Sequence, residues 1–590
     1  MLDNKALTGK YFFRELAIVG DAGGNATDAR SLLGAITFNA AGQYSISAQQ
    51  TLGTGPATAA TGSGTYSVAP SGTVSLTDPL RNTLTINARW GAEALIGSTT
   101  EAPDNTFNFF VAIPAPVAPQ SNIVLNGAYN FVSLEFPGAT SANVKNGFIT
   151  LQANGAGGFT NIKVFGHAAN VNSGIPATQT PTGGTYALMG DGSGVAAFGN
   201  SAALLTGSKN LYVSRSGNVI LGGSTTAGSQ DLLVGIRALK GGATNASWSG
   251  LFWTAGLRVA SDGTTAGYAG SLNALPTFNK TTLARRLHQA GSGGAIDVTL
   301  VNGYMLMPGG IGSSELTQVA LGSAGDLFLT AGVNAADASS YELNFGIRMP
   351  NLSGTGLFLN PQGVVNGASF APAGNPISPG EFITLYSQNI GPQTPAAGKP
   401  PYPRTLGGVG VTVNGSPAPL HYVGPNQINL LVPYATMGAK ATIVVNGNGM
   451  ISNSVDVPLA TTAPGVFSSD QSGTGLGAVL HSDFSLVNDM SPTRRGETVL
   501  IFLTGLGAVT PAVQDGTAGG SNPVSSTNSP VNVFVAGRPA TVVFSGLAPG
   551  FPGLYQINAT VPLDVVGTGR LTLAIVTPNA FHCEVDLPVE

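Results

Sequence analysis

Short stretches in which apolar and polar residues alternate follow one another along nearly the whole chain, separated by glycine-containing turns. Residues 34–42 are typical, because Ile36 and Phe38 alternate with Thr37 and a turn follows at Gly42. Alternation with a period of two predicts a strand with one buried face, and turns about every eight to twelve residues indicate a sandwich or a barrel. One segment, 281–288, fits a helix or a strand equally well. The sequence therefore predicts an all-β protein.

The C-terminal part of the chain contains a duplication. Gln427-Ile428-Asn429 returns as Gln556-Ile557-Asn558, and the strand runs on to a proline in each copy. Upstream, Pro379-Gly380-Glu381 matches Arg495-Gly496-Glu497. Self-similarity of this kind outranks local propensity, so the repeated segments are expected to fold in the same way.

Each copy also contains a predicted hairpin. Gly415 and Gly537 follow matching strands at positions where a two-residue turn requires positive φ, which glycine adopts without a steric penalty. Short β-branched strands joined by such turns are typical of a sandwich. We therefore expect two immunoglobulin-like sandwiches, at residues 363–465 and 474–590.

A longer pattern repeats three times before the duplication. A glycine is followed by a leucine at one spacing in each repeat, at Gly9 and Leu16, Gly127 and Leu134, and Gly250 and Leu257. Each repeat holds enough short strands for a small closed β-barrel or a two-sheet β-sandwich, and closure would remove exposed edges. The pattern leaves both forms open. The predicted units are residues 1–116, 121–240 and, more diverged, 245–351.

The duplicated part resembles a known family. The opening Val365-Asn366-Gly367-Ala368-Ser369-Phe370, the Asn-Gly-x-Pro-Ala hairpin and the Gln-Ile-Asn-x-x-Val-Pro strand are similar to the uncharacterised Solibacter-type C-terminal domain of large secreted acidobacterial proteins. The resemblance covers about residues 363–590. That family is similar to immunoglobulin folds of the IPT/TIG type and has no assigned catalytic residues. It implies a secreted multidomain protein and transfers no site.

The charge content is low. Charged residues make up 9% of the chain, against roughly 25% in an ordinary soluble domain. The surface is therefore expected to consist largely of uncharged polar residues and glycine, with little repulsion between copies. The net charge of −4 and the lack of a basic run argue against a nucleic-acid partner. No apolar run is long enough for a membrane-spanning helix.

The location of the protein is inferred indirectly. Residues 1–7 have neither the apolar core nor the cleavage site of a signal peptide. We expect that a leader has been removed from this numbering and that the protein is secreted or on the cell surface.

Candidate chemistry is sparse. The chain has one cysteine, Cys583, which excludes an intramolecular disulfide and is interpreted as a core residue. The histidines are scattered without the spacing of a zinc site, at His167, His288, His421, His481 and His582. Two aspartate pairs, Asp21 with Asp28 and Asp483 with Asp489, lack the regular carboxylate spacing of a calcium loop. No nucleophile elbow or phosphate-binding loop occurs. The sequence thus predicts no catalytic, cofactor-binding or metal site.

Two binding hypotheses remain beside this prediction. A sugar-stacking surface could be built from Trp90, Trp248, Trp253, Tyr268 and Tyr304. The alternating position of Trp253 in a strand favours a core role. A barrel interior that holds a lipid-like ligand is the other hypothesis, and it requires open interiors.

The sequence favours a non-enzymatic structural subunit of an extracellular or cell-surface assembly, such as a filament, sheath or matrix. The expected partner is the protein itself, and one route is exchange of the strand at residues 6–19 with a neighbour, although this strand is more simply the first strand of its own unit. The alternative is a secreted adhesin or a protein that binds surface polysaccharide. A third class is an enzyme with an unrecognised site in the N-terminal units.

Overall fold

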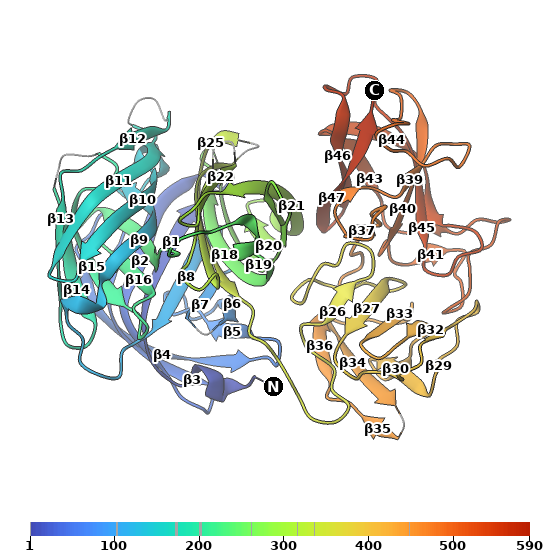
Figure 1. The fold of residues 1–590 in the computed structure, drawn as a ribbon, viewed down its shortest axis with the longest axis horizontal. Helices are drawn as coiled ribbons and strands as arrows, with labels where there is room; N and C mark the ends of the chain where they lie inside the picture. Colours follow the sequence, from blue (N-terminus) through green and yellow to red (C-terminus); the bar gives the residue numbers. More distant parts are fainter. Residues whose placement is uncertain are drawn as a thin grey trace.

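The computed structural model describes residues 2–91, 93–101, 104–170, 175–199, 203–260, 262–314, 317–334, 337–447 and 449–590. Within these residues the chain is all-β, with single turns of 3-10 helix at η1 (Asn4–Leu7), η2 (Asn122–Val124), η3 (Ser141–Asn143) and η5 (Asn245–Ser247). Three barrels form one half of the molecule and two immunoglobulin-like sandwiches form the other (Figure 1). The predicted fold class is confirmed. In the described part of the chain, no helix is long and apolar enough to cross a membrane.

The first unit is a closed barrel. Its strands are β1 (Gly9–Gly20), β2 (Ala26–Phe38), β3 (Gln43–Leu52), β4 (Thr58–Val68), β5 (Thr73–Thr77), β6 (Thr85–Trp90), β7 (Leu95–Ser98) and β8 (Thr106–Pro114). Each strand pairs with the next, and β1 pairs antiparallel with both β2 and β8, which closes the sheet. Because β1 has a partner on each side, it completes its own barrel, the simpler of the two roles considered for residues 6–19.

The second and third units close in the same way. The second consists of β9 (Asn126–Pro137), β10 (Lys145–Asn154), β11 (Gly158–Ala168), β12 (Ala177–Gln179), β13 (Gly184–Leu188), β14 (Ser193–Phe198), β15 (Gly207–Val213), β16 (Val219–Gly223) and β17 (Ser229–Arg237). The third consists of β18 (Gly250–Val259), β19 (Thr265–Pro276), β20 (Thr281–Gly291), β21 (Gly294–Leu306), β22 (Ile311–Ser314), β23 (Thr317–Leu321), β24 (Leu327–Asn334) and β25 (Asp337–Arg348). The pairings of β9 with β17 and of β18 with β25 join the first and last strands. The ambiguous segment 281–288 is strand, within β20.

The strands that close each barrel are buried on both faces. In β1, Tyr11 and Phe13 point into the barrel and join its core, whereas Phe12, Leu16 and Ile18 point outward into a second apolar core. This outer core also contains residues from the second and third barrels, including β17 and β25. Double burial explains why β1 and β8 are apolar at most consecutive positions and do not alternate.

The three barrels pack head to tail around the outer core. Strand β1 contacts β16 and β17, strands β9 and β10 contact β24, and strands β18 and β19 contact β7 and β8. Each barrel therefore presents its first strands to the last strands of another, and the third contact returns to the first barrel. A head-to-tail interface that closes in this way is a ring with approximate threefold symmetry.

The first sandwich consists of two sheets. One contains β26 (Val364–Asn366), β27 (Phe382–Tyr386), β33 (Gln427–Leu431), β32 (Leu420–Val423) and β28 (Ala396–Ala397). The other contains β29 (Thr405–Leu406), β30 (Val409–Val413), β31 (Ser416–Pro417), β34 (Lys440–Gly447), β35 (Met450–Ile451) and β36 (Val455–Pro458). Aliphatic side chains from both sheets form one core between them.

The second sandwich repeats this plan with longer strands. Its strands are β37 (Gly465–Val466), β38 (Gly475–Leu476), β39 (Val479–Leu480), β40 (Thr498–Thr504), β41 (Val509–Thr510), β42 (Ser526–Thr527), β43 (Asn532–Val535), β44 (Arg538–Leu547), β45 (Tyr555–Thr560), β46 (Gly569–Thr577) and β47 (Ala580–Val589). Strand β45 pairs with β40 as β33 pairs with β27.

The repeated Gln-Ile-Asn motif makes the same contact in both sandwiches. The amide of Gln427 donates to the side chain of Asn429 at 2.8 Å, and that of Gln556 donates to Asn558 at 2.7 Å. The isoleucine between them points into the core in each case. The motif therefore recurs because one face of the strand is a polar bridge and the other is core.

The predicted hairpins are also present. Gly415 has a φ of 79° and Gly537 a φ of 76°, and the preceding Asn414 and Ala536 are left-handed as well, with φ of 49° and 47°. Positive φ at both central residues is the geometry of a type I′ turn, which matches the twist of a hairpin. Asparagine tolerates this conformation, whereas alanine is strained in it.

The second sandwich docks on the third barrel by extending its sheet. Strand β47 pairs in parallel with β21, with Asp297 opposite Ala580 and Val298 opposite Phe581. This edge of β21 is available because β22 pairs with β21 only at Met305 and Leu306. The sandwich half is therefore attached to the barrel half by backbone hydrogen bonds.

We expect Ala536→Asn to stabilise the second sandwich. The left-handed conformation costs an ordinary L-residue roughly 1–2 kcal/mol, and asparagine relieves most of this strain. The free energy of unfolding of this sandwich, measured by hydrogen exchange of its strand amides, should therefore rise. The matched change Asn414→Ala should lower the stability of the first sandwich, because it also removes a bond from the Thr442 backbone at 2.7 Å. A decrease in stability for Ala536→Asn would contradict the strain argument.

We expect a single barrel to be insoluble or partly unfolded when it is produced alone. Residues 121–240 would expose the apolar residues of β9, β16 and β17 that the other barrels cover, and large exposed apolar patches promote association. Residues 1–351 should instead be a folded monomer in size-exclusion chromatography. A soluble, cooperatively melting second barrel would show that the ring is not needed for stability.

Candidate functional site

One position inside each barrel carries a polar side chain. It lies on the last strand, at Asn108 in β8, Asp231 in β17 and Glu342 in β25. Across the closing strand pair these residues face, in the same order, Ala17, Glu135 and Arg258. All three polar residues are buried. Each barrel thus has a polar cluster at the same level of its otherwise largely apolar interior.

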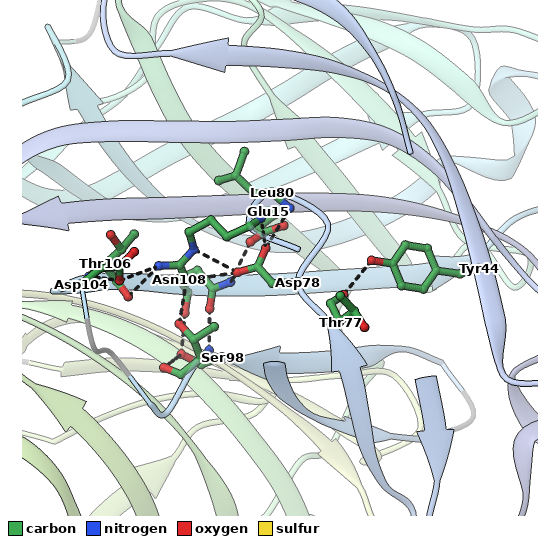
Figure 2. Close-up of polar contacts among 11 residues, drawn as sticks. Glu15, Tyr44, Thr77, Asp78, Leu80, Ser98, Asp104, Thr106 and Asn108 are labelled. Atoms are coloured by element: carbon green, nitrogen blue, oxygen red, sulfur yellow. Dashed lines mark hydrogen bonds and ion pairs between the residues drawn. The ribbon is translucent and has the colours of Figure 1, made fainter. Parts of the chain in front are cut away.

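In the first barrel the cluster contains two carboxyl groups. The amide of Asn108 donates to Glu15 at 2.7 Å and to Asp78 at 3.3 Å, and the backbone N–H of Thr99 donates to the Asn108 oxygen at 2.5 Å (Figure 2). Arg81 donates to Asp78 at 3.1 Å and forms an ion pair with that carboxylate. Glu15 has no cation of its own in direct contact among the described residues.

The environment of Glu15 favours its neutral form. Burial raises the pKa of Glu15 well above its ordinary value, and the nearby charge of Asp78 raises it further. A carboxyl pair of this kind can hold and transfer a proton. However, both side chains are fully buried, and a hollow of about 370 Å³ at the barrel mouth, lined by β3, β4 and the loop that contains Asp78 and Arg81, does not reach Glu15. The cluster therefore has a structural role inside the barrel.

In the second barrel the polar residue is reached from outside. Arg14 of β1 extends into the second barrel, where its Nε donates to the Asp231 backbone at 2.7 Å and its Nη2 to the carboxylate at 3.1 Å. Lys209 contacts the same carboxylate at 2.5 Å. A Cβ at position 223 would lie 2.6 Å from Arg14, so Gly223 provides the opening. Burial favours a neutral Asp231, but Lys209 and Arg14 hold its pKa below the ordinary value.

The third barrel contains a different set of partners. Arg285 contacts Glu342 at 3.1 Å, the hydroxyl of Tyr268 donates to Glu342 at 2.8 Å, and Arg285 also donates to Asn302 at 2.8 Å. The interiors of the three barrels are thus filled by apolar cores and by these polar clusters. Among the residues that the structure describes, this packing does not supply the open interior that a lipid-like ligand requires.

A large hollow lies between domains. A cleft of about 680 Å³ is bounded by the first barrel, the third barrel and both sandwiches. Its lining includes Asn87, Arg89, His288, Tyr434, Pro458 and Asn579. A second hollow of about 300 Å³ shares Asn87, Arg89, Gly374 and Pro458 with it. The two hollows meet where the first sandwich faces strand β6.

The residues singled out in the sequence lie apart. The histidines have separate neighbours: His167 stacks on Tyr341, His288 bonds Asp297, His421 packs against Phe382, His481 bonds Glu497 and His582 bonds Thr299. The aspartates are held locally: Asp21 by Asn25, Asp28 by Arg30, Asp483 by Ser485 and Asp489 by Arg570. No group of three metal-ligating side chains occurs in the described part of the chain.

The aromatic residues do not form a sugar-stacking surface. Trp248 and Trp253 are fully buried, Tyr268 and Tyr304 are almost so, and Trp90 is half-buried. Trp253 belongs to the core shared by the barrels, as its alternating position predicted. Cys583 is partly buried at the interface with the third barrel, where its thiol donates to the Thr299 carbonyl at 2.9 Å and burial raises its pKa to about 12.

Sequence reasoning missed the residues that carry the clusters and the cleft. Arg14 and Glu15 interrupt an apolar run, and Arg89 stands in a short alternating strand. An isolated charge inside an apolar strand is the signal that could have identified them, because such a charge requires a buried partner. The identity of the partner is a property of the fold.

Comparison with known proteins gives no family. No protein-family model and no curated protein matches the chain. The plexin A4 extracellular region, domains 1 to 8, matches with 6% identity and a TM-score of 0.13 over 95% of this chain and 80% of that one. The H. pylori β clamp matches with 6% identity and a TM-score of 0.08 over 58% of this chain and 92% of that one. Scores at this level carry no argument about function.

We expect Glu15→Gln to remove part of the pH dependence of stability. The folded state holds a proton on Glu15 that the unfolded chain releases above a pKa of about 4.5. Stability should therefore decrease as the pH rises from there through the raised pKa. Glutamine keeps the shape and needs no proton, so the variant should have a flatter profile and be at least as stable near pH 8 in urea titrations. Parallel profiles of the two proteins would contradict a neutral Glu15.

Glu497→Gln is a control with the opposite sign. Hydrogen bonds from the Arg494 backbone and from His481 lower the pKa of Glu497 in spite of partial burial. Its stabilisation should be present above the ordinary pKa and be lost as the pH falls, so this variant should flatten only the acid side of the profile.

Proposed function

We propose that the protein is a non-enzymatic structural subunit of an extracellular or cell-surface assembly, such as a filament, sheath or matrix. The observation that carries the proposal is the way in which the barrels are packed. Their interiors are filled, and their apolar outer faces are covered by one another. Three barrels packed in this way form a rigid spacer. Their apolar and polar contacts hold the barrels together.

The charge content supports the same proposal. With 9% charged residues, two copies can approach with little electrostatic repulsion or desolvation of charge. The resemblance of residues 363–590 to a domain of secreted proteins supports a location outside the cell. We take the partner to be a second copy of this chain.

A loop of the second sandwich offers a contact for this partner. Phe484, Leu486 and Met490 are exposed by 71%, 42% and 90% of their surface. The loop is nevertheless fixed at its base, because His481 bonds Glu497 at 2.5 Å and the His481 backbone bonds that of Ser485 at 2.9 Å. Exposed apolar residues on a fixed loop are typical of an interaction surface.

The test is the size of the protein in solution. Sedimentation velocity of the full chain, over a range of concentrations and at low and high salt, should show species that grow with concentration. Phe484→Ser combined with Met490→Ser should shift this growth to at least about tenfold higher concentration, which corresponds to about 1.4 kcal/mol. Phe278→Ser, at a side chain exposed by 99% on the third barrel, is the matched control and should leave association unchanged.

A monomer at every concentration and salt would contradict the structural proposal. A binding role, for which the interdomain cleft is the specific observation, would then replace it. Negative-stain images of the native material would distinguish an open filament from a closed oligomer.

A further inference from the structure

Arg89 is a buried cation in the outer wall of the first barrel. On β6, Ile86 and Ala88 point into the barrel core, so Asn87 and Arg89 point outward toward the sandwiches. Only 6% of the Arg89 surface is exposed. In this position the guanidinium is covered by the third barrel and by the first sandwich, yet it lines both interdomain hollows.

The guanidinium has few partners. Its Nη1 donates to the neighbouring Ala88 carbonyl at 3.2 Å, and the group lies 5.6 Å from the ring of Trp253. Its buried Nε has no hydrogen-bond acceptor, and no carboxylate of the described residues forms an ion pair with it. Burial alone lowers the pKa of Arg89, to about 10. Arg89 therefore remains charged at neutral pH without a counter-charge.

The other charged groups of the cleft are already paired. Asp297 bonds His288 at 2.8 Å, and Asp456 pairs with Lys440. A buried charge is unfavourable unless it is paired, so Arg89 lowers the stability of the protein by itself. A ligand that supplies one negative charge would remove this penalty. The planar guanidinium fits a carboxylate, which it can bind through two parallel hydrogen bonds.

The space beside Arg89 has room for the rest of a ligand molecule, called its body here, next to the charged group. Gly374 of the first sandwich faces it, and a Cβ there would lie 3.3 Å from the Trp253 ring and 3.9 Å from Arg89 Nη2. Asn87 and Thr100 line the same cleft and carry polar groups that bond one another. The cleft wall beyond them is formed by Pro376, Pro379, Tyr434, Pro458 and Leu459. A volume of about 680 Å³ is in the range that small-molecule sites occupy.

We propose that this cleft is a binding site for an organic carboxylate. The carboxylate lies on Arg89, the polar atoms near it contact Asn87 and Thr100, and the body of the ligand packs on the proline and tyrosine wall. The site is made by the first barrel, the third barrel and the sandwiches together, so an occupied cleft also ties the two halves of the molecule to each other. The inference is independent of self-assembly.

The experiment uses the full chain and two carboxylates with different bodies. Benzoate has an apolar body and digalacturonate has a saccharide body, and their neutral counterparts are benzyl alcohol and a neutral disaccharide. At least one carboxylate should raise the melting temperature with increasing concentration and give a saturable heat in calorimetry. The neutral counterparts and inorganic phosphate should give neither effect. The carboxylate that binds identifies the class of body.

Two variants connect the effect to Arg89. Arg89→Met keeps the length of the side chain and removes the unpaired charge, so it should melt at a higher temperature than the natural protein and bind the carboxylate at least tenfold more weakly. Arg538→Met removes a half-exposed arginine of the second sandwich and should change neither property. The gain in stability of Arg89→Met verifies that the variant is folded.

Several outcomes would overturn the proposal. They are the absence of binding by either carboxylate, equal binding by Arg89→Met, and binding of phosphate or of a neutral counterpart as strong as that of the carboxylate. A lower melting temperature of Arg89→Met would show that the guanidinium stabilises the free protein, and it would remove the argument for a missing counter-charge.

Discussion

The structure depends on one apolar core that three barrels share. Each barrel contributes the pair of strands that closes it, and these strands are buried on both faces. Burial of a large aliphatic or aromatic side chain contributes about 1.5–3 kcal/mol, so strands with a double set of such residues supply much of the stability. This constraint also decides where polar groups lie. Polar side chains of the closing strands gather mainly in the barrel interiors, and those on the outer face, such as Arg14, have a buried partner in the next barrel.

The repeats preserve a position and vary its chemistry. Asn108, Asp231 and Glu342 occupy one place in three barrels, but their partners are a carboxyl pair, two cations from different barrels, and an arginine with a tyrosine. The sandwiches behave in the same way. Glu381 and Glu497 both accept a bond from the backbone three residues earlier, yet burial raises the pKa of Glu381 while hydrogen bonds lower that of Glu497.

Much of the architecture could be predicted from the sequence because it is local. The Gln-Ile-Asn strands, the hairpin glycines and the alternating cores depend on residues that are close in the chain, and two copies of a pattern reinforce one another. The choice between a closed barrel and a sandwich, and the packing of the barrels into a ring, could not be predicted, because they depend on contacts between distant strands. Arg14 and Asp231 lie 217 residues apart, and Arg89 becomes a buried cation only when the first sandwich covers it.

The head-to-tail ring limits the number of barrels, and it determines when during synthesis the N-terminal half can finish folding. In each barrel the first strands contact one neighbour and the last strands contact the other. The third barrel therefore completes the contacts of the first, and no contact face is left for a fourth barrel. During synthesis the outer faces of β7 and β8 stay uncovered until β18 and β19 have been made, and those of β9 and β10 stay uncovered until β24 has been made. The nascent chain therefore exposes apolar surface until the last strand of the third barrel, β25, has left the ribosome, and only then does the N-terminal half become a finished object.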